Sequence, residues 1–390
     1  NDPIDIEAKK RGNSFYFPDR VIPMLPKEIS NDICSLIPNE ERACVIVEIN
    51  IKNFKVMSFN IHRAKIISIA RLTYSKVDEI HKSNLKNDRL FSLIKNLFNS
   101  YKVLKKISEN REKINFSTSE FEIIDQSDKD FYLKKKKRLQ SYGLIEEFMI
   151  LANENVARFL KRNKLNTIFR NHEKPKNEKI KELKNVLTQN NIYNNESFNY
   201  QKDFNKILKI IEENNFFLNE SLLRTQSKAY YSEKNIGHFG LGLDFYTHFT
   251  SPIRRYSDLH VHRDLMNFFF DGKKNKQEPN LYEHLTLQEK KSDHMERKIL
   301  ERACSLYLKN QKQKHFVGVI DGIEKFGIFI RAIDLPFSCL VRNKYRGFND
   351  NKFLEKKFRI GQVVTFKIKK NDVMSGKILA DNVKIISGKI

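Results

Sequence analysis

The sequence predicts an α+β protein in which a long, largely helical part is followed by a small β-barrel. Up to about residue 311 of the 390, several stretches repeat apolar residues at steps of three and four, which is typical of amphipathic helices. From His315 onward the chain instead consists of short β-branched and aromatic runs separated by Gly, Asn and Asp. About five strands in about 75 residues are typical of a small barrel, for which the OB-fold is the natural candidate. We therefore expect two domains, residues 1–311 and 312–390.

The first 50 residues indicate loop and extended structure. Three prolines, at positions 18, 23 and 26, fix the backbone around short apolar pairs, so we expect a rigid extended segment that starts at Gly12 and becomes strand-like toward Asn50. Long helices are expected at residues 84–113, 132–162, 204–214 and 285–311. Between the last two, the polar stretch 272–280 is expected to be a surface loop. The barrel strands are expected at 316–320, 327–330, 363–368 and 378–386.

Composition favours a polyanionic partner. The chain has 72 Lys and Arg against 48 Asp and Glu, a net charge of +24, which favours nucleic acid before an anionic membrane surface. The alternative is a solvated basic surface without function, because Lys, Asn and Ile are frequent throughout. No apolar run approaches the ~20 residues of a membrane span, and no secretory signal opens the chain. The four cysteines form no CxxC pair, so we expect reduced thiols, no zinc site and a cytoplasmic protein.

The clearest chemical signal lies in residues 237–258. Ser251 is followed by Pro252, and a hydroxyl residue before a proline is a typical helix start. A helix that starts there would present free amides, hydroxyls and guanidiniums to one place, which suits a phosphate. The side chains concerned are those of Thr250, Ser251, Arg254 and Arg255. The alternative is a capped helix whose arginines form structural ion pairs.

Two residues after this start could fix one of the arginines. Asp258 lies four residues after Arg254, and His262 lies four after Asp258, so an Arg–Asp–His ladder would hold Arg254 in place. The histidines around this stretch, at 238, 248, 260 and 262, fit no standard zinc spacing. The glycines at 237, 240 and 242 form no nucleotide loop, because no Gly-Lys-Ser/Thr follows them.

At these residues the chain resembles a known family. The run His238 to Arg263 resembles the ribonuclease II (RNB) superfamily signature, His-Phe-Gly-Leu … Thr-Ser-Pro-Ile-Arg-Arg-Tyr … His-Arg. Further matches are residues 11–26, 70–74, 146–153 and 169–175. The tripeptides Gly-Asn-Ser and Tyr-Phe-Pro within residues 12–18 resemble the ribonuclease R branch of this superfamily more than ribonuclease II itself. Because that family ends in an S1-type OB domain, the resemblance extends over essentially the whole chain.

The resemblance implies a processive 3′→5′ exoribonuclease of RNA degradation and turnover. In this family, single-stranded RNA enters a deep channel, Mg²⁺ activates water, and nucleoside 5′-monophosphates are released. By motif position Tyr16 would stack on the 3′-terminal base and Arg254 would contact the scissile phosphate, while Thr250, Ser251 and Arg255 would grip neighbouring phosphates. For Tyr16 the alternative is a packed core tyrosine. A monomer without a membrane partner is expected.

The chain departs from the family at the metal site. The family binds its metal through four closely spaced aspartates upstream of the Tyr16 motif, and no such cluster occurs in this sequence. Asp2 and Asp5 belong to the segment just after it, whereas Asp125, Asp128 and Asp130 lie far downstream at the wrong spacing. The cold-shock domains of the family are also absent.

Two interpretations of this departure are open. The chain is either a C-terminal fragment of a longer ribonuclease R, with Mg²⁺ ligands upstream of residue 1, or a decayed product that only binds RNA. In both cases we expect the 390 residues as they stand to bind catalytic Mg²⁺ poorly.

The C-terminal barrel would contribute a second RNA contact. In S1-type domains one sheet face carries aromatics that stack on bases, with basic residues around them. We expect Phe316, Phe326 and Phe329 to stack, with barrel core as the alternative, above all for Phe316. The cations expected to contact the RNA backbone are Lys325, Arg331, Arg342 and Lys344. The densest basic run, Lys134–Arg138, is expected to be a solvated helix face rather than an RNA contact.

Overall fold

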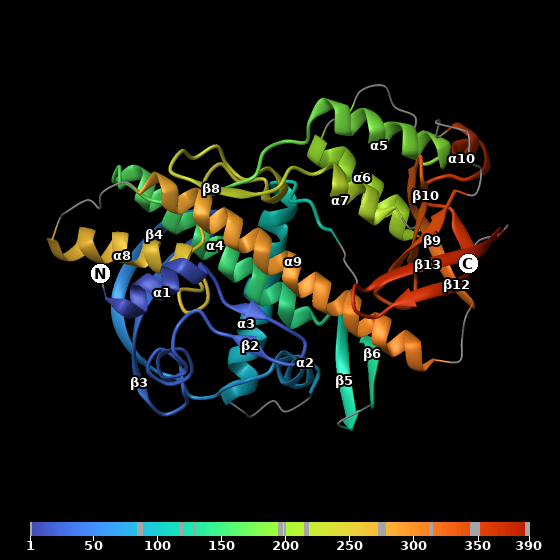
Figure 1. Ribbon diagram of the computed structural model, residues 1–390. Helices are drawn as coiled ribbons and strands as arrows, with labels where there is room; N and C mark the ends of the chain where they lie inside the picture. Colours follow the sequence, from blue (N-terminus) through green and yellow to red (C-terminus); the bar gives the residue numbers. More distant parts are fainter. Residues whose placement is uncertain are drawn as a thin grey trace.

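The fold joins a helix-rich part to a closed β-barrel, which confirms the predicted α+β class (Figure 1). The computed structural model describes residues 2–83, 89–116, 120–127, 130–193, 198, 200–213, 218–271, 278–311, 315–343 and 352–386. None of the helices within these ranges has the length and apolar character needed to cross a membrane.

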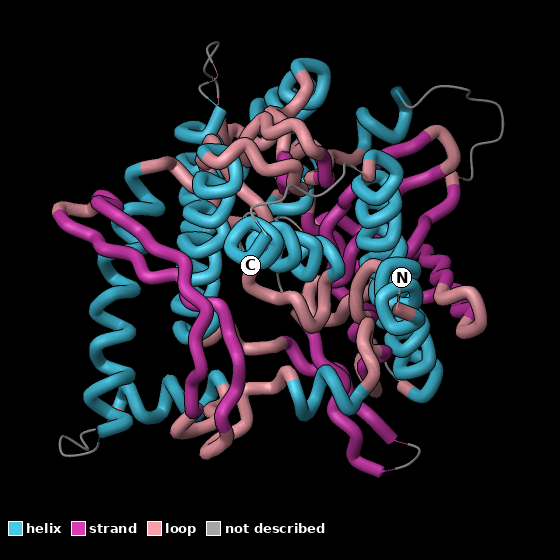
Figure 2. The backbone as a smooth tube through the Cα atoms, turned by 90° about the vertical axis from the view of Figure 1, so that its left-hand side faces the viewer, coloured by secondary structure: helices cyan, strands magenta, loops and turns pink. Residues whose placement is uncertain are grey.

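The N-terminal elements confirm the extended segment predicted after Gly12 only in part, because residues 28–33 within it form a helical turn. These elements are α1 (Pro3–Arg11), β1 (Phe15–Tyr16), β2 (Val21–Ile22), the helical turn η1 (Glu28–Ile33), β3 (Glu41–Lys52) and β4 (Lys55–Ile67). The strands β1 and β2 form a small antiparallel pair, and β3 and β4 form a long hairpin along the side of the molecule that faces the viewer in Figure 2. The inner face of the hairpin, with Val45, Val47 and Ile61, packs against the main core.

The predicted long helices are present, with one error at a helix start. The long helices are α3 (Arg89–Asn110), α4 (Gln140–Arg162), α6 (Tyr200–Glu213) and α9 (Pro279–Asn310). The helix expected from residue 132 begins only at residue 140, because the preceding residues form β6 (Asp130–Lys135), paired with β5 (Phe121–Ser127). Leu133 of this hairpin is buried in the barrel core, which stabilises a strand here over a helical turn.

The remaining elements before the barrel, with α10, connect these helices and strands. They are α2 (Tyr74–Lys82), β7 (Phe169–Asn171), α5 (Asn177–Gln189), α7 (Asn219–Thr225), β8 (Tyr230–Ser232), η2 (Phe239–Leu241), α8 (Tyr256–Asp271) and α10 (Lys352–Lys357). The loop expected at 272–280 is partly wrong, since α9 already begins at Pro279, a residue type favoured at the first helical position. Residues 272–277 and, of the predicted helix 84–113, residues 84–88 lie outside the described part.

The five C-terminal strands form a closed barrel, as the strand pattern predicts. They are β9 (His315–Glu324), β10 (Gly327–Ala332), β11 (Ser338–Arg342), β12 (Val363–Asp372) and β13 (Lys377–Ile385). Their order around the barrel is β10-β11-β13-β12-β9, and every pairing is antiparallel except that of β11 with β13. Ile320, Ile330, Val364 and Phe366 fill the interior and are fully buried.

The barrel is attached through residues that precede it in the chain. The C-terminal turns of α9 end at the barrel in Figure 1, and Cys304 and Leu308 of α9 belong to the barrel core together with Leu133. An ion pair of 2.6 Å joins Arg224 of α7 to Asp321 of β9. The boundary expected at residue 312 therefore lies between two elements that share one core.

The main core holds α4, α8 and α9 together. Val156 and Leu160 of α4, Val261 and Leu265 of α8, and Leu281 and Leu285 of α9 are all buried in one cluster with Ala8 of α1. Residue 12 approaches the same cluster closely. Gly12 has a φ of +73°, and a Cβ built on it would lie 2.8 Å from Cβ of Gln288 in α9. Only glycine tolerates both the backbone angle and this approach.

We predict that Gly12→Ala destabilises the protein by more than ~1 kcal/mol, because the new methyl group meets both a positive φ and the α9 side chains. Urea unfolding followed by circular dichroism measures this. The control is Gly322→Ala in β9, where the nearest atom to a new Cβ is 3.7 Å away, an ordinary contact. We expect the control to stay within ~0.5 kcal/mol of the wild type. Equal losses in the two variants would contradict the prediction.

Candidate RNA-binding and active site

Two segments about 240 residues apart in the sequence form a short antiparallel pair. The N–H of Ser14 donates to the carbonyl of Arg254 at 2.9 Å, and the N–H of Tyr256 donates to the carbonyl of Gly12 at 2.8 Å. The buried hydroxyl of Ser14 also accepts the N–H of Met24 at 2.9 Å, which fixes the end of the β1–β2 pair. These contacts bring the start of β1 against the start of α8.

Tyr16, two residues farther along β1, lies at the surface beside α9. Its side chain is 45% exposed, so the alternative of a packed core tyrosine is wrong. Its N–H donates to Oε1 of Glu296 at 3.3 Å, and Ser292 donates to the same oxygen at 3.1 Å. The next residue, Phe17, donates its N–H to the carbonyl of Arg20 at 2.8 Å. The ring is therefore exposed on a firmly held backbone.

The predicted helix start at Ser251 is wrong, because α8 begins five residues later, at Tyr256. A turn precedes the helix, in which the N–H groups of Arg254 and Arg255 donate to the carbonyl of Ser251 at 3.2 and 3.1 Å. Proline at the second position suits a turn of this kind as well as the first turn of a helix. The turn is also held by Asp258 in the first turn of α8, which accepts the N–H of Ser251 at 2.7 Å.

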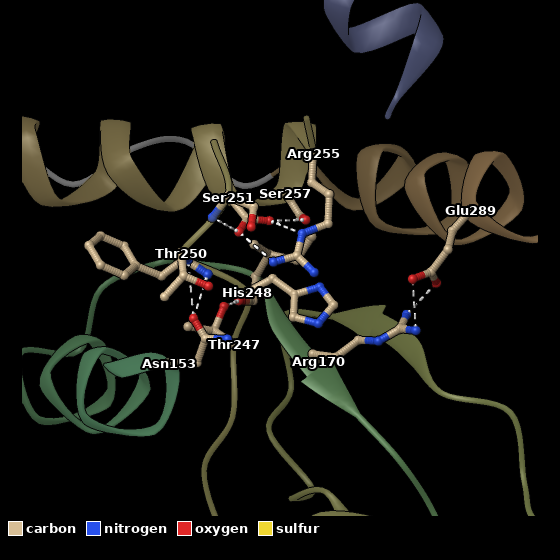
Figure 3. A network of polar contacts seen from close by, with 12 residues as sticks. Asn153, Arg170, Thr247, His248, Thr250, Ser251, Arg255, Ser257 and Glu289 are labelled. Atoms are coloured by element: carbon tan, nitrogen blue, oxygen red, sulfur yellow. Dashed lines mark hydrogen bonds and ion pairs between the residues drawn. The ribbon is translucent and has the colours of Figure 1, made fainter. Parts of the chain in front are cut away.

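A second side chain, from α4, binds the loop before this turn (Figure 3). Asn153 is 1% exposed, and its Oδ1 accepts the N–H groups of Phe249 at 3.0 Å and Thr250 at 3.2 Å. Its Nδ2 donates to the hydroxyl of Tyr246 at 3.2 Å. The amides of residues 249, 250, 251, 254 and 255 thus all have partners within the protein. These five amides are therefore not available to a phosphate, contrary to the expectation for them.

Asp258 is the centre of the arrangement, and it binds Arg255 rather than Arg254. The residue is 0% exposed, and its carboxylate accepts Nε and Nη2 of Arg255, both at 2.8 Å, and the hydroxyl of Ser257 at 3.0 Å. The predicted ladder from Arg254 through Asp258 to His262 is wrong, because it presumes that Arg254 already lies in the helix. His262 instead packs against Phe249, whose carbonyl lies 3.0 Å from Nε2 and whose ring lies 4.4 Å from the imidazole.

Three side-chain groups of the loop are left available. Among the described residues, the guanidinium of Arg254 and the hydroxyls of Thr250 and Ser251 have no hydrogen-bond or ion-pair partner. The hydroxyl oxygen of Thr250 is moreover buried, and a buried hydroxyl without a partner costs ~1–3 kcal/mol. Asn153 and Asp258 therefore hold the backbone of the loop, while the Arg254 guanidinium and the two hydroxyls can still form hydrogen bonds with a ligand.

A polar network that the sequence did not reveal adjoins the loop of residues 248–255. Arg170 of β7 forms an ion pair with Glu289 of α9 at 2.6 Å, and its guanidinium lies 4.7 Å from the centre of the Tyr231 ring. Tyr231 bonds His248 at 2.8 Å. Burial lowers the pKa of His248 well below its usual value, and nearby arginines lower it further. Burial likewise lowers the pKa of His238 to about 3, so both imidazoles are neutral at neutral pH.

The aspartates of the N-terminal segment have structural partners. Asp2 caps α1, and Asp5 accepts the hydroxyl of Tyr256 at 2.9 Å and pairs with Arg263 at 2.7 Å. Of the downstream aspartates, Asp128 and the side chains of Asp125 and Asp130 lie outside the described residues. Within the described ranges, no three His, Cys, Asp or Glu side chains are grouped so as to hold a metal ion. Asp2 and Asp5, the aspartates nearest to the Tyr16 motif, are thus engaged in the capping and pairing of helices.

On the barrel, two of the three predicted aromatics share the outer surface. Phe326 is 56% exposed, and its ring lies edge-on to Phe329 at 5.8 Å. Arg331 is two residues after Phe329 in β10 and so lies on the same face of the strand. Phe316 instead packs edge-on against Phe337 at 5.5 Å within the barrel core, so the structure favours its core role. Lys344 lies outside the described residues.

We predict that Asp258→Asn destabilises the protein by ~3–5 kcal/mol, because the largely buried Arg255 would lose the carboxylate that binds two of its nitrogens. Urea unfolding measures the loss, and a variant that does not fold agrees with it. The matched control is Asp244→Asn, a change of the same kind at an exposed position, which we expect to stay within ~0.5 kcal/mol of the wild type. A loss at Asp258 no larger than the control's would contradict the prediction.

Comparison with known proteins gives a consistent family. A family model described as the RNB domain matches residues 1–271. Ribonuclease R of Escherichia coli is 34% identical over 366 residues, which cover 87% of this chain and 44% of that protein. The chain spans about half the length of the curated relatives it matches, from 44% to 57%.

Solved structures are similar over nearly the whole chain. Mycoplasma genitalium RNase R in complex with ribose-methylated single-stranded RNA matches with a TM-score of 0.85 and 28% identity, covering 99% of this chain and 64% of that one. The same protein in complex with double-stranded RNA matches with a TM-score of 0.84 and 30% identity, covering 99% and 68%. By sequence and by structure, this chain belongs to the RNB-domain family, alongside these ribonuclease R proteins.

Proposed function

We propose that this chain is the C-terminal part of a processive 3′→5′ exoribonuclease of the ribonuclease R type. Its reaction would be the hydrolysis of RNA to nucleoside 5′-monophosphates, in RNA degradation and turnover. The observation that carries the proposal is the backbone pairing of residues 12–14 with residues 254–256. It joins an exposed aromatic ring to a loop with an unpaired arginine, which are the parts needed to hold an RNA end and its last phosphodiester.

Tyr16 is proposed to stack on the 3′-terminal base. Its ring is exposed, and its backbone is bound to Glu296 and to β2, so little conformational freedom is lost when a base is bound. Stacking of this kind contributes ~1–3 kcal/mol per base without regard to sequence. The ring would thereby determine which phosphodiester lies at the reaction centre.

Arg254 is proposed as the catalytic cation. Its guanidinium would contact the scissile phosphate and stabilise the charge that develops on it. Thr250 and Ser251 would donate their hydroxyls to neighbouring phosphates. Arg255 already uses two of its nitrogens on Asp258, so we assign it chiefly to holding the loop, with phosphate contact limited to its remaining nitrogen.

The barrel, residues 312–390, is proposed to be an S1-type OB domain that binds single-stranded RNA. Phe326 and Phe329 would stack on bases, and Arg331 would contact the backbone beside them. For Phe316 we retain only a core role. The protein is proposed to act as a monomer in the cytoplasm, in agreement with four cysteines that are all free thiols.

Mg²⁺ is proposed as the cofactor of the complete enzyme, and its ligands would lie outside this chain. The roles given above to Tyr16, Arg254, Thr250 and Ser251 involve no metal ligand. The activity of the 390 residues alone is consequently expected to be low, although RNA binding is retained.

The proposal is tested with 5′-labelled single-stranded RNA, with and without Mg²⁺, on this chain and on a version extended at its N-terminus to the length of the relatives. We expect the extended protein to release mononucleotides and leave a short end product, and this chain to bind RNA with a strong salt dependence. A folded, extended protein that binds RNA but leaves it intact would contradict the nuclease proposal and favour the alternative, a binding remnant.

We predict that Arg254→Lys, in the extended protein, lowers turnover by ~10²–10³ while RNA affinity changes only a few-fold, because lysine keeps the charge but loses the two-pronged contact. Single-turnover kinetics and filter binding measure the two effects separately. The control is Arg20→Lys, an exposed arginine whose one ion pair within the described ranges is with its neighbour Asp19, and we expect it to leave both unchanged. Unchanged turnover in Arg254→Lys would remove the catalytic role of this residue.

A further inference from the structure

Two buried hydroxyl groups connect Asp258 to His248, next to the loop that carries Arg254 (Figure 3). The hydroxyl of Ser257 lies 3.0 Å from Oδ2 of Asp258 and 3.2 Å from the hydroxyl of Tyr231. The hydroxyl of Tyr231 in turn lies 2.8 Å from Nδ1 of His248. Ser257 is 2% and Tyr231 6% exposed, so these contacts are made in the protein interior.

The two rings of this chain of contacts are held by packing as well as by hydrogen bonds. The N–H of Tyr231 donates to the hydroxyl of Thr286 in α9 at 3.0 Å. The imidazole of His248 lies edge-on to two tyrosine rings, with centres 5.7 Å from that of Tyr231 and 5.8 Å from that of Tyr246. The oxygen and nitrogen atoms that form the chain therefore have fixed positions, and only their protons can be arranged in more than one way.

The carboxylate of Asp258 determines where the proton of Ser257 lies. A carboxylate only accepts hydrogen bonds, and a serine hydroxyl has a single proton to donate. Asp258 accepts the N–H of Ser251 and two N–H groups of Arg255, and Ser257 is its fourth neighbour. Without a proton between them, the oxygens of Ser257 and Asp258 would repel each other at 3.0 Å. The hydroxyl proton of Ser257 is therefore assigned to Asp258.

The remaining protons follow in order from this assignment. Because Ser257 has used its proton, its contact with Tyr231 needs the proton of the Tyr231 hydroxyl. The contact of Tyr231 with His248 then needs a proton on Nδ1 of the imidazole. In the opposite order, Tyr231 would donate to His248, and one of the two contacts of Ser257 would have no proton. The order with a proton in every contact thus runs from His248 to Asp258.

This order determines the form of His248. Burial, followed by the charge of Arg255 and Arg170, lowers the pKa of His248 well below its usual value, so the neutral ring has one proton. With that proton on Nδ1, the other nitrogen, Nε2, is an unprotonated acceptor, and it has no hydrogen bond to any residue that the structure describes. A free histidine side chain in water favours the opposite form, with the proton on Nε2. The chain of contacts therefore imposes the less common form.

The same chain supports the loop of the candidate active site. Asp258 holds the amide of Ser251 and the guanidinium of Arg255, which are the two ends of the turn that carries Arg254. A hydroxyl that accepts a hydrogen bond is a stronger donor, so donation by Tyr231 strengthens the bond from Ser257 to Asp258. The position of the loop therefore depends on a hydroxyl group that does not contact it.

We propose that Tyr231 is a positioning residue of the candidate active site. Its hydroxyl donates to Ser257, which completes the donors around Asp258, and accepts the Nδ1 proton of His248, which leaves Nε2 of that ring unprotonated. Because Tyr231 is buried, it acts through Asp258 and His248 and not by contact with RNA. The inference rests on the proposed function, since it takes the loop with Arg254 as the place where the phosphodiester is hydrolysed.

The proton order is tested on this chain by NMR with ¹⁵N-labelled histidine, because the ¹⁵N shifts of a neutral imidazole show which nitrogen carries the proton. The His248 signals are assigned by their loss in His248→Gln. We expect the Nδ1–H form in the wild type and the Nε2–H form in Ser257→Ala, where the proton of Tyr231 has no other acceptor than His248. Ser257 forms no hydrogen bond with His248, so direct contact does not predict this change. An Nε2–H form in the wild type, or an unchanged form in Ser257→Ala, would overturn the proposed order.

The effect on the reaction is tested in the N-terminally extended protein with Tyr231→Phe and Ser257→Ala. We expect single-turnover cleavage of 5′-labelled RNA to fall ~10- to 100-fold while RNA affinity stays within ~2-fold, because the loop loses its exact orientation and no phosphate contact is removed. Tyr231→Phe retains the ring that lies beside Arg170.

The matched control is Tyr230→Phe, which removes the same group from the neighbouring residue of β8, where the hydroxyl donates to Glu173 at 2.9 Å. We expect it to keep the wild-type form of His248 and the wild-type turnover. If the folded, extended wild type left RNA intact, the proposed function would fail and the positioning role with it, while the proton order measured on this chain would stand. If it degraded RNA but both variants kept its turnover, or lost affinity and turnover equally, the positioning role alone would be overturned.

Discussion

The arrangement of the candidate site depends on a short backbone pairing, two hydrogen bonds between residues 12–14 and residues 254–256. Neither segment has regular structure long enough to fix its own position. Gly12 allows the N-terminal segment to approach α9, and Ser14 ties the end of β2 to the same point. Because backbone groups make the pairing, it does not use the side chain of Arg254, and the ring of Tyr16, two residues after Ser14, is exposed. Backbone hydrogen bonds therefore position the site, whereas the side chains determine its chemistry.

Around this pairing the protein separates charges that hold the fold from charges that face solvent. Asp258 with Arg255, Glu289 with Arg170, and Lys113 with Glu147 are compensated pairs that are wholly or largely buried. Arg254, Lys137 and Arg138 have no such partner within the described residues. A net charge of +24 does not distinguish these classes. The structure distinguishes them by burial and pairing, because burying an ion without a partner costs far more free energy than leaving it in water.

Local sequence patterns predicted much of the fold and the place of the candidate site. Amphipathic periodicity revealed four long helices, and alternating β-runs revealed the barrel, because both patterns reflect burial of one face. The errors arose where contacts beyond the local pattern hold a segment. Residues 251–254 form a turn that is held by Asp258 and by the pairing with residues 12–14, and residues 132–135 form a strand because Leu133 enters the barrel core. Asn153 contacts the loop from 96 residues away, and Glu296 contacts β1 from 280 residues away. Spacing along the chain does not predict either contact.

Helix α9 gives the chain a mechanical connection from one end to the other. Its first turns pack against α1, its middle binds the backbone of Tyr16 through Glu296, and its last turns complete the barrel interior with Cys304 and Leu308. Cleavage of the chain at residue 311 would leave the barrel without part of its own interior, so the barrel and the helical part should melt in a single cooperative transition. If RNA bound to the barrel displaced it, α9 would transmit the displacement to Tyr16, which is proposed to bind the 3′ end of the same strand.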